Sequence, residues 1–333
     1  MSISNNRFLL FVSFLFILTV CFISCDQSGL NNSSYLTSLN SDKTNLQDEH
    51  FYNFGVKCKA LMSSRFKNLE QLKTILTIEY DRDYLKLDSS ECQNSMVTLS
   101  YISNGEKIIR ALTSGVKQNE LLLLPKANLY TQSRFVLSYP NHVRQRRELE
   151  LIYLLSRRMG EIFGSGDKAF YDIAEASSHH INMPNLAYQN AQDSSEKGYL
   201  NTFNHVTAQA IMTSFFSEDL ADIIVDLHEI NSMPELTNGR FSESQLIDLN
   251  NNPVDNYIDI INNEVGQKIG LRLKEKFKLN EKSICTPVLL ATYLNDIQSY
   301  YIWALEIGMN NFRPTDELII RFSNKLNKLL KEL

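Results

Sequence analysis

The stretch Ala221-Asp222-Ile223-Ile224-Val225-Asp226-Leu227-His228-Glu229 decides the predicted fold of this chain. It is an apolar, β-branched run that delivers a histidine between two carboxylates. Such a run is typical of a strand buried on both faces of a parallel sheet, and the carboxyl ends of these strands form the crevice in which α/β proteins bind ligands. We therefore expect His228 to bind a metal ion there, with Asp226 or Glu229 fixing its tautomer. A strand that ends in a solvated His-Glu pair is the alternative.

Apolar, β-branched segments alternate with longer helical stretches along the rest of the chain, which is the pattern of a sheet covered by helices. The expected strands are 75–80, 96–102, 121–124, 223–227, 288–292 and 300–305. The expected helices are 107–112, 147–163, 205–216, 254–277 and 316–330. The predicted fold class is α/β, with a mixed, largely parallel sheet and helices on both faces.

The N-terminus carries the signals of secretion. Arg7 precedes an apolar run over 8–23, which ends at Ser24-Cys25. A charged residue, an apolar stretch and a small residue before the cut describe a secretory signal, and a cysteine directly after that small residue resembles a bacterial lipobox. We expect residues 1–24 to be a lipoprotein signal peptide and Cys25 to be acylated, which anchors the protein to a membrane of the bacterial cell envelope, on the periplasmic or surface side. An uncleaved membrane anchor is the alternative.

The mature chain divides into a tether and a globular part. Residues 26–50 are rich in Asn, Ser, Asp and Thr and cannot bury enough apolar surface to fold alone, so that 25–50 is expected to be a flexible tether. Residues 51–333 are long enough for one large domain. The net charge of −5 excludes a broad basic surface, and no nucleic-acid partner is expected.

The cysteines predict neither a disulfide framework nor a thiolate zinc site. Cys58, Cys92 and Cys285 show no C-x-x-C spacing. One disulfide bond among them stays open, and the sequence does not indicate its pairing.

Three further residues have the chemistry of a hydrolytic site. Glu106 follows a Gly-containing turn and is expected at a helix N-terminus, either as a metal ligand or simply as a capping carboxylate. Arg134 follows the strand that Pro125 ends, and it could polarise a carbonyl group. Glu306 ends an apolar strand, where apolar neighbours would raise its pKa as a general acid/base requires; an edge glutamate without this role is the alternative.

In order and local context these segments are similar to the succinylglutamate desuccinylase/aspartoacylase family of zinc-carboxypeptidase-like hydrolases. The family motifs are G-x-H-G-x-E after a strand, P-x-A-N with a downstream Arg, N-R-x-[FY]-P, D-L-H at a strand end, and a late strand that ends in Glu. Their counterparts here are 102–106, 125–128 with Arg134, 185–188, 226–228 and Glu306. The resemblance covers roughly 96–333 and implies a zinc carboxypeptidase-like domain, with a helical insertion at about 140–180.

The resemblance also implies roles for single residues. Zinc would be held by Glu106, His228 and the group at the position of Ser103. Glu306 would take a proton from water and Arg134 would steady the oxyanion. The substrate-binding residues would be Asn128 and Asn185.

The chain departs from the family motifs at three positions. Ser103 stands where the family has its first histidine ligand, Leu186 where it has a substrate-binding arginine, and Gln189 where it has a proline. An alternative register aligns Lys117 and Glu120 with the first motif.

Other histidines of the chain could replace the missing first ligand. Either His179 or His180 could supply it, whereas His142 and His205 are expected to be surface or helix residues.

The predicted function is that of an envelope-anchored lipoprotein that hydrolyses amide or peptide bonds with zinc, acting on peptides or acyl-amino acids. The alternative is a catalytically inactive member of the family that acts as a binding or structural surface lipoprotein. Ser103 and Leu186 favour the second function, whereas Glu106 and Glu306 favour the first.

Overall fold

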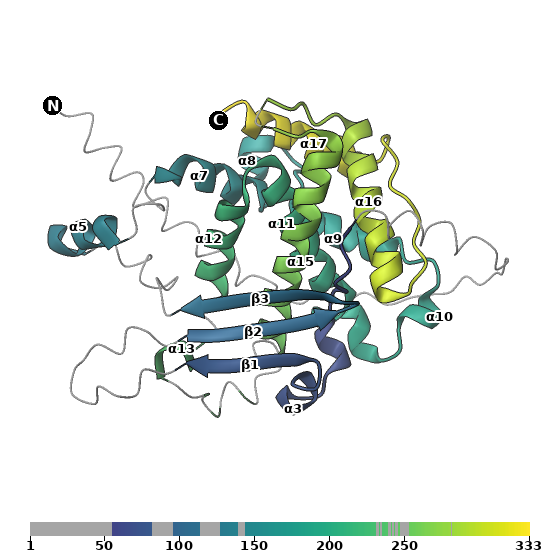
Figure 1. Ribbon diagram of the computed structural model, residues 1–333. Helices are drawn as coiled ribbons and strands as arrows, with labels where there is room; N and C mark the ends of the chain where they lie inside the picture. Colours follow the sequence, from purple (N-terminus) through teal and green to yellow (C-terminus); the bar gives the residue numbers. More distant parts are fainter. Residues whose placement is uncertain are drawn as a thin grey trace.

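A computed structural model describes residues 55–81, 96–113, 127–138, 144–230, 253–280 and 282–333, together with 233, 235–238, 241, 243 and 246. Most of these residues are helical, and their strands form one three-stranded antiparallel sheet. The helical body lies against one face of this sheet (Figure 1). The predicted α/β fold, with a mixed, largely parallel sheet and helices on both faces, is therefore wrong, and so is the zinc carboxypeptidase-like architecture.

The sheet has the order β1 (Leu76–Asp81), β2 (Met96–Ser103), β3 (Glu106–Thr113). Alternate residues face the helices, so that Leu99 and Ile108 are buried while Ile102 and Ile109 are exposed. The strands expected at 75–80 and 96–102 are confirmed as β1 and β2.

The helix expected at 107–112 is wrong, because this segment is strand β3. Asn104 and Gly105 have φ angles of 51° and 78°. Two successive positive φ angles make the tight hairpin turn that Asn-Gly favours, and Ser103 pairs with Glu106 across it. The chain therefore returns as a strand instead of entering a helix.

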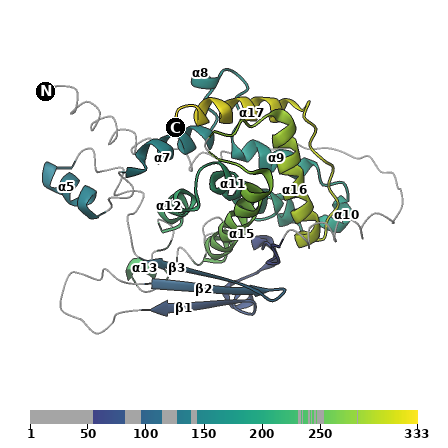
Figure 2. The ribbon, with the colours of Figure 1, turned by 45° about the horizontal axis from the view of Figure 1, so that its top comes forward.

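The helices form a body of several layers over the sheet, which Figure 2 shows from a second direction. Their bounds are α3 (Leu69–Leu72), α5 (Leu129–Ser138), α7 (Arg146–Leu155), α8 (Gly160–Phe163), α9 (Phe170–His179), α10 (Pro184–Ala187), α11 (Tyr199–Phe215), α12 (Glu218–Glu229), α13 (Glu235–Asn238), α15 (Pro253–Phe277), α16 (Pro287–Leu305) and α17 (Glu317–Leu330), with short 3₁₀ turns at Ser63–Arg65 and Ala191–Ser194. The helices expected at 205–216, 254–277 and 316–330 are confirmed as α11, α15 and α17. The helix expected at 147–163 is two helices, α7 and α8, separated by 156–159.

Three expected strands are helical. The segment 223–227, on which the predicted fold depended, lies inside α12, and both 288–292 and 300–305 lie inside α16. Ser217 caps α12 by accepting a hydrogen bond from the backbone N–H of Leu220, and Thr286 caps α16 in the same way from Leu289, directly before Pro287. These caps and burial at helical spacing override the strand preference of β-branched residues. The strand expected at 121–124 lies outside the described residues.

Helices α11 and α15 form the centre of the helical body and run in the same direction. Asn201 contacts Asp259 near their starts, and Ser214 contacts Gly270 further along both. A Cβ atom at Gly266 would lie 2.6 Å from the carbonyl oxygen of Val206, so this close approach requires glycine. The two helices are thus held close enough for polar side chains on each to meet in the interior.

The N-terminal predictions concern residues outside the described ones. These are the signal peptide over 1–24, the lipidated Cys25 and the flexible tether over 25–50. Among the described helices, none combines the length and the apolar character that crossing a bilayer needs. Cys58 and Cys285 are buried free thiols, and Cys92 is not described.

Candidate metal centre

Glu106, one of the expected zinc ligands, lies on β3 and is engaged by the protein itself. Its Oε2 accepts hydrogen bonds from the backbone N–H groups of Lys57 (2.6 Å) and Cys58 (3.1 Å), and its Oε1 lies 2.8 Å from Nζ of Lys268. Partial burial raises its pKa, but these hydrogen bonds and the Lys268 charge outweigh that effect, so that the pKa of Glu106 is lowered. The Glu106 carboxylate thus holds the segment around Lys57 and Cys58 against the hairpin of β2 and β3.

Ser103 and Glu306 contact the same segment through Lys59. Ser103 Oγ accepts a hydrogen bond from the backbone N–H of Lys59, and Lys59 Nζ lies 2.7 Å from Oε1 of Glu306. The Glu306 side chain is 79% exposed, and the hydrogen bond and charge of Lys59 lower its pKa. The raised pKa expected of a general acid/base is therefore not found, because Glu306 follows a helix at the surface instead of ending a buried strand.

The other predicted residues are dispersed. Asn128 accepts a hydrogen bond from the backbone N–H of Thr131 at the start of α5, and Arg134 is exposed on that helix. Asn185 is exposed on α10. Cys25, His142 and the alternative pair Lys117 and Glu120 lie outside the described residues.

The histidine pair and His228 are placed on helices. His179 ends α9, and Nδ1 of His180 lies 2.9 Å from Nε2 of Gln298. His228 lies in the last turn of α12. Within the described part of the chain, no group of three metal-binding side chains contains Glu106, His228, His179 or His180.

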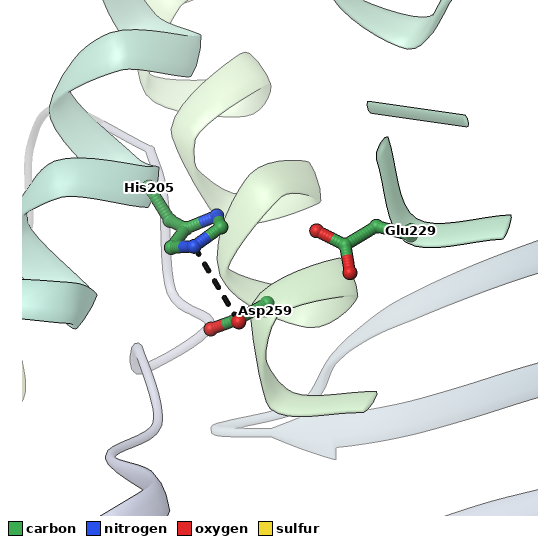
Figure 3. Close-up of side chains that lie close together, drawn as sticks. All are labelled: His205, Glu229 and Asp259. Carbon is green, nitrogen blue, oxygen red and sulfur yellow. Dashed lines mark ion pairs between the residues drawn. The ribbon is translucent and has the colours of Figure 1, made fainter. Parts of the chain in front are cut away.

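A different group meets in the interior. His205 on α11, Glu229 on α12 and Asp259 on α15 each offer a ligand atom, and these atoms all lie within 4.8 Å of one another. Figure 3 shows the imidazole and the two carboxyl groups directed toward a common space between three helices. This buried group could hold a metal ion.

Neighbouring amides fix the orientation of the group. His205 Nδ1 lies 2.9 Å from Oδ1 of Asn263, and its Nε2 lies 3.4 Å from Oδ2 of Asp259. Asn263 Nδ2 is 3.5 Å from Oε1 of Glu229, and Asn201 donates to the second oxygen of Asp259 at 2.8 Å. The Asn263 amide thus turns its oxygen to the imidazole, which places the proton on Nδ1 and leaves Nε2 as the ligand nitrogen.

Burial works against charge in every member of the group. It raises the pKa of Glu229 and of Asp259, and it lowers the pKa of His205 despite the hydrogen bond with Asn263. Burial and the neighbouring Asp259 raise the pKa of Asp255 to about 7. Desolvated carboxyl groups so close together need either protons or a cation to be stable.

His228, next to Glu229 in the chain, has its pKa lowered by burial, as His205 does. Burial, followed by the proximity of His205, lowers the pKa of His228 to about 4, so that its imidazole is neutral at physiological pH.

The donor set fits zinc. Zinc binds imidazole nitrogen and carboxylate oxygen, and three protein ligands with one position left for water are the usual catalytic arrangement. The Asn263 amide that orients His205 is the kind of outer hydrogen bond that metal-binding histidines have.

Sequence reasoning missed this group for identifiable reasons. Asp255 and Asp259 are four residues apart on the helix expected at 254–277 and therefore lie on one helical face. Asn201 and His205 have the same spacing, but the helix expected at 205–216 did not include Asn201. Glu229 was predicted only as a hydrogen-bond partner of His228, because α12 was expected to be a strand.

Comparison with protein-family models, with curated proteins and with solved structures finds no match to this chain. The resemblance to the succinylglutamate desuccinylase/aspartoacylase family stays a prediction from the quoted motifs. The candidate metal centre rests on the geometry alone.

Proposed function

We propose that this protein is a metal-binding protein of the bacterial envelope that holds one divalent ion, zinc before others, between His205, Glu229 and Asp259. The proposal keeps the zinc ion of the predicted hydrolase and assigns no catalysis to it. It is now supported by a group of residues different from Ser103, Glu106 and His228.

The observation that carries the proposal is the orientation of the His205 ring. Its Nδ1 faces the Asn263 oxygen, so that Nε2 presents a lone pair to the Asp259 carboxylate at 3.4 Å. Two acceptors at this distance repel each other unless a proton or a cation lies near both. Burial disfavours a proton on the imidazole. Burial favours a proton on Asp259, but one proton on that carboxyl group leaves Glu229, a second carboxyl group in the same space, without a cation. A divalent cation satisfies all three groups at once.

Metal content tests the proposal directly. The full chain, purified in detergent without chelators and without a histidine tag, is expected to contain about one zinc per chain. The His205→Ala variant should contain none, whereas Glu306→Gln, which changes an exposed side chain remote from the group, should match the unmodified protein. A metal-free protein that takes up no zinc, manganese or iron from solution would refute the proposal.

Amide or peptide hydrolysis at the same centre is the second candidate. Asp255 favours it, since it lies one helical turn before Asp259 on α15, and a carboxylate can act as a general base. Bound zinc would supply an acidic water molecule. Asp255→Asn should then abolish hydrolysis of acyl-amino acids or peptides without lowering the zinc content, and hydrolysis that persists in this variant would exclude Asp255 as the base.

Attachment to the envelope through Cys25 is part of the proposal. The chain is expected to incorporate labelled palmitate in a bacterial host and to sediment with membranes. A Cys25→Ser variant should do neither, and labelling that persists in it would refute lipidation at this residue.

A further inference from the structure

Arg110 joins the sheet to the two helices that carry the carboxylates of the metal centre. It lies on β3 with its side chain 16% exposed. Its Nη1 lies 2.8 Å from Oδ1 of Asp222 and 3.4 Å from Oε1 of Glu264, and its Nη2 lies 2.6 Å from Oδ1 of Asp226. One guanidinium group therefore neutralises acids on α12 and on α15.

Two of the residues held by Arg110, Asp222 and Asp226, share a helical face with a proposed ligand. Asp222, Asp226 and Glu229 follow one another at spacings of four and three residues, which places them on one face of α12. Glu264 lies five residues after Asp259 on α15. Gln267 adds a second link between the two helices by donating to Oδ1 of Asp222 at 2.9 Å.

Arg110 offsets the repulsion between the acidic side chains around it. Three carboxyl groups converge on one guanidinium group in a partly buried space between helices and sheet. Without this cation the carboxylates of Asp222, Asp226 and Glu264 would repel one another at low dielectric. Helix α12 would then move away from α15, and Glu229 would move away from Asp259.

We propose that Arg110 is a positioning residue of the metal centre, which sets the separation of Glu229 and Asp259 by holding α12 against α15. This inference rests on the proposed function, because it concerns the affinity of the same centre. Arg110 contacts Asp222, Asp226 and Glu264 instead of the proposed ligands, and through it the sheet becomes part of the metal-binding structure.

The test compares zinc dissociation constants, measured by competition with a chromogenic chelator, in four full-length proteins. Arg110→Gln should raise the dissociation constant at least about tenfold, as loss of outer-shell support commonly does. The triple variant Arg110→Gln, Asp222→Asn, Asp226→Asn removes the repulsion together with the cation and should recover most of the affinity. Lys325→Met is the stability control, because it breaks the buried ion pair with Asp167 on other elements. It should lower the melting temperature without changing the dissociation constant.

The outcomes separate this inference from the proposed function. An unmodified protein that binds no metal refutes the proposed function. If the unmodified protein binds zinc, then equal affinity in Arg110→Gln overturns only the role of Arg110. A triple variant that stays weak, or a Lys325→Met variant that loses as much affinity, also overturns it. If Arg110→Gln does not fold, Glu264→Ala replaces it, since it removes the acid on α15 through which Arg110 links this helix to α12; unchanged affinity in that variant overturns the inference.

Discussion

His205 Nε2 lies 3.4 Å from Oδ2 of Asp259 across the interface of the two central helices. Helices α11 and α15 run in the same direction, and the contact of Asn201 with Asp259 is followed one turn later on both helices by the contact of His205 with Asn263. The metal centre is thus a property of how two long helices pack, and metal binding should be linked to the stability of the whole helical body.

Removal of metal should lower the melting temperature. A ligand that binds only the folded state at about 100 times its dissociation constant stabilises by roughly 2.7 kcal/mol, which corresponds to a rise in melting temperature of roughly 4 °C for a chain of this size. We expect chelator treatment to lower the melting temperature and equimolar zinc to restore it, measured by circular dichroism. A melting temperature that is the same with and without metal would contradict binding at a centre formed only on folding.

Substitution of the ligands should separate metal binding from folding. Asp259→Asn removes a carboxylate that is costly to bury without a cation, so the metal-free variant should unfold at the same or a higher temperature than the metal-free unmodified protein. Zinc should no longer stabilise it. Glu229→Gln should behave in the same way as Asp259→Asn. Glu106→Gln is the control: it should lower the melting temperature without affecting the response to zinc, because Glu106 bonds to Lys57, Cys58 and Lys268. Full zinc stabilisation of Asp259→Asn would remove Asp259 from the ligand set.

The contribution of Asp255 to the stability of the metal-free protein should fall as the pH rises from acid to neutral. The pKa of Asp255 is about 7 in the folded state, against roughly 3.9 in an unfolded chain. A raised folded pKa contributes stability that is present below pH 4 and is lost as the pH rises through 7. Denaturant titrations should show the Asp255→Asn variant gaining roughly 2–4 kcal/mol relative to the unmodified protein between pH 4 and pH 8. A difference independent of pH would show that Asp255 ionises normally.

Part of the fold could be predicted from local patterns, whereas short segments were predicted wrongly in both directions, helix for strand and strand for helix. Helices α11, α15 and α17 were found by their length and helical spacing, which local sequence specifies well. The error at 223–227 arose because a short β-branched run fits a buried strand and a buried helix equally well. The Ser217 cap before it, Thr286-Pro287 before α16 and the Asn104-Gly105 turn were visible in the sequence and give the correct elements.

Only those parts of the candidate site that lie within a single helix could be predicted from the sequence. The spacing of Asp255 and Asp259 places two carboxyl groups on one helical face. The spacing of Asn201 and His205 places an amide and an imidazole on one face of another helix. That these faces meet depends on the close packing of α11 and α15, and Glu229 joins them only because α12 folds back beside both. Tertiary relationships of this kind are not contained in the spacing of any one segment.

Glycine at the interface of α11 and α15 should be essential for stability and for zinc affinity together. A Cβ atom at Gly266 would lie 2.6 Å from the carbonyl oxygen of Val206, beside His205, and one at Gly270 would lie 2.7 Å from that of Ala210. Alanine gains about 1 kcal/mol in helix propensity, but crowding of two backbones costs roughly 1–3 kcal/mol or more. Gly266→Ala should therefore lower the melting temperature and weaken zinc binding, because it separates His205 from Asp259. Gly160→Ala, where the added atom meets nothing within 4 Å, should do neither. Unchanged zinc affinity in Gly266→Ala would mean that the centre does not depend on this packing.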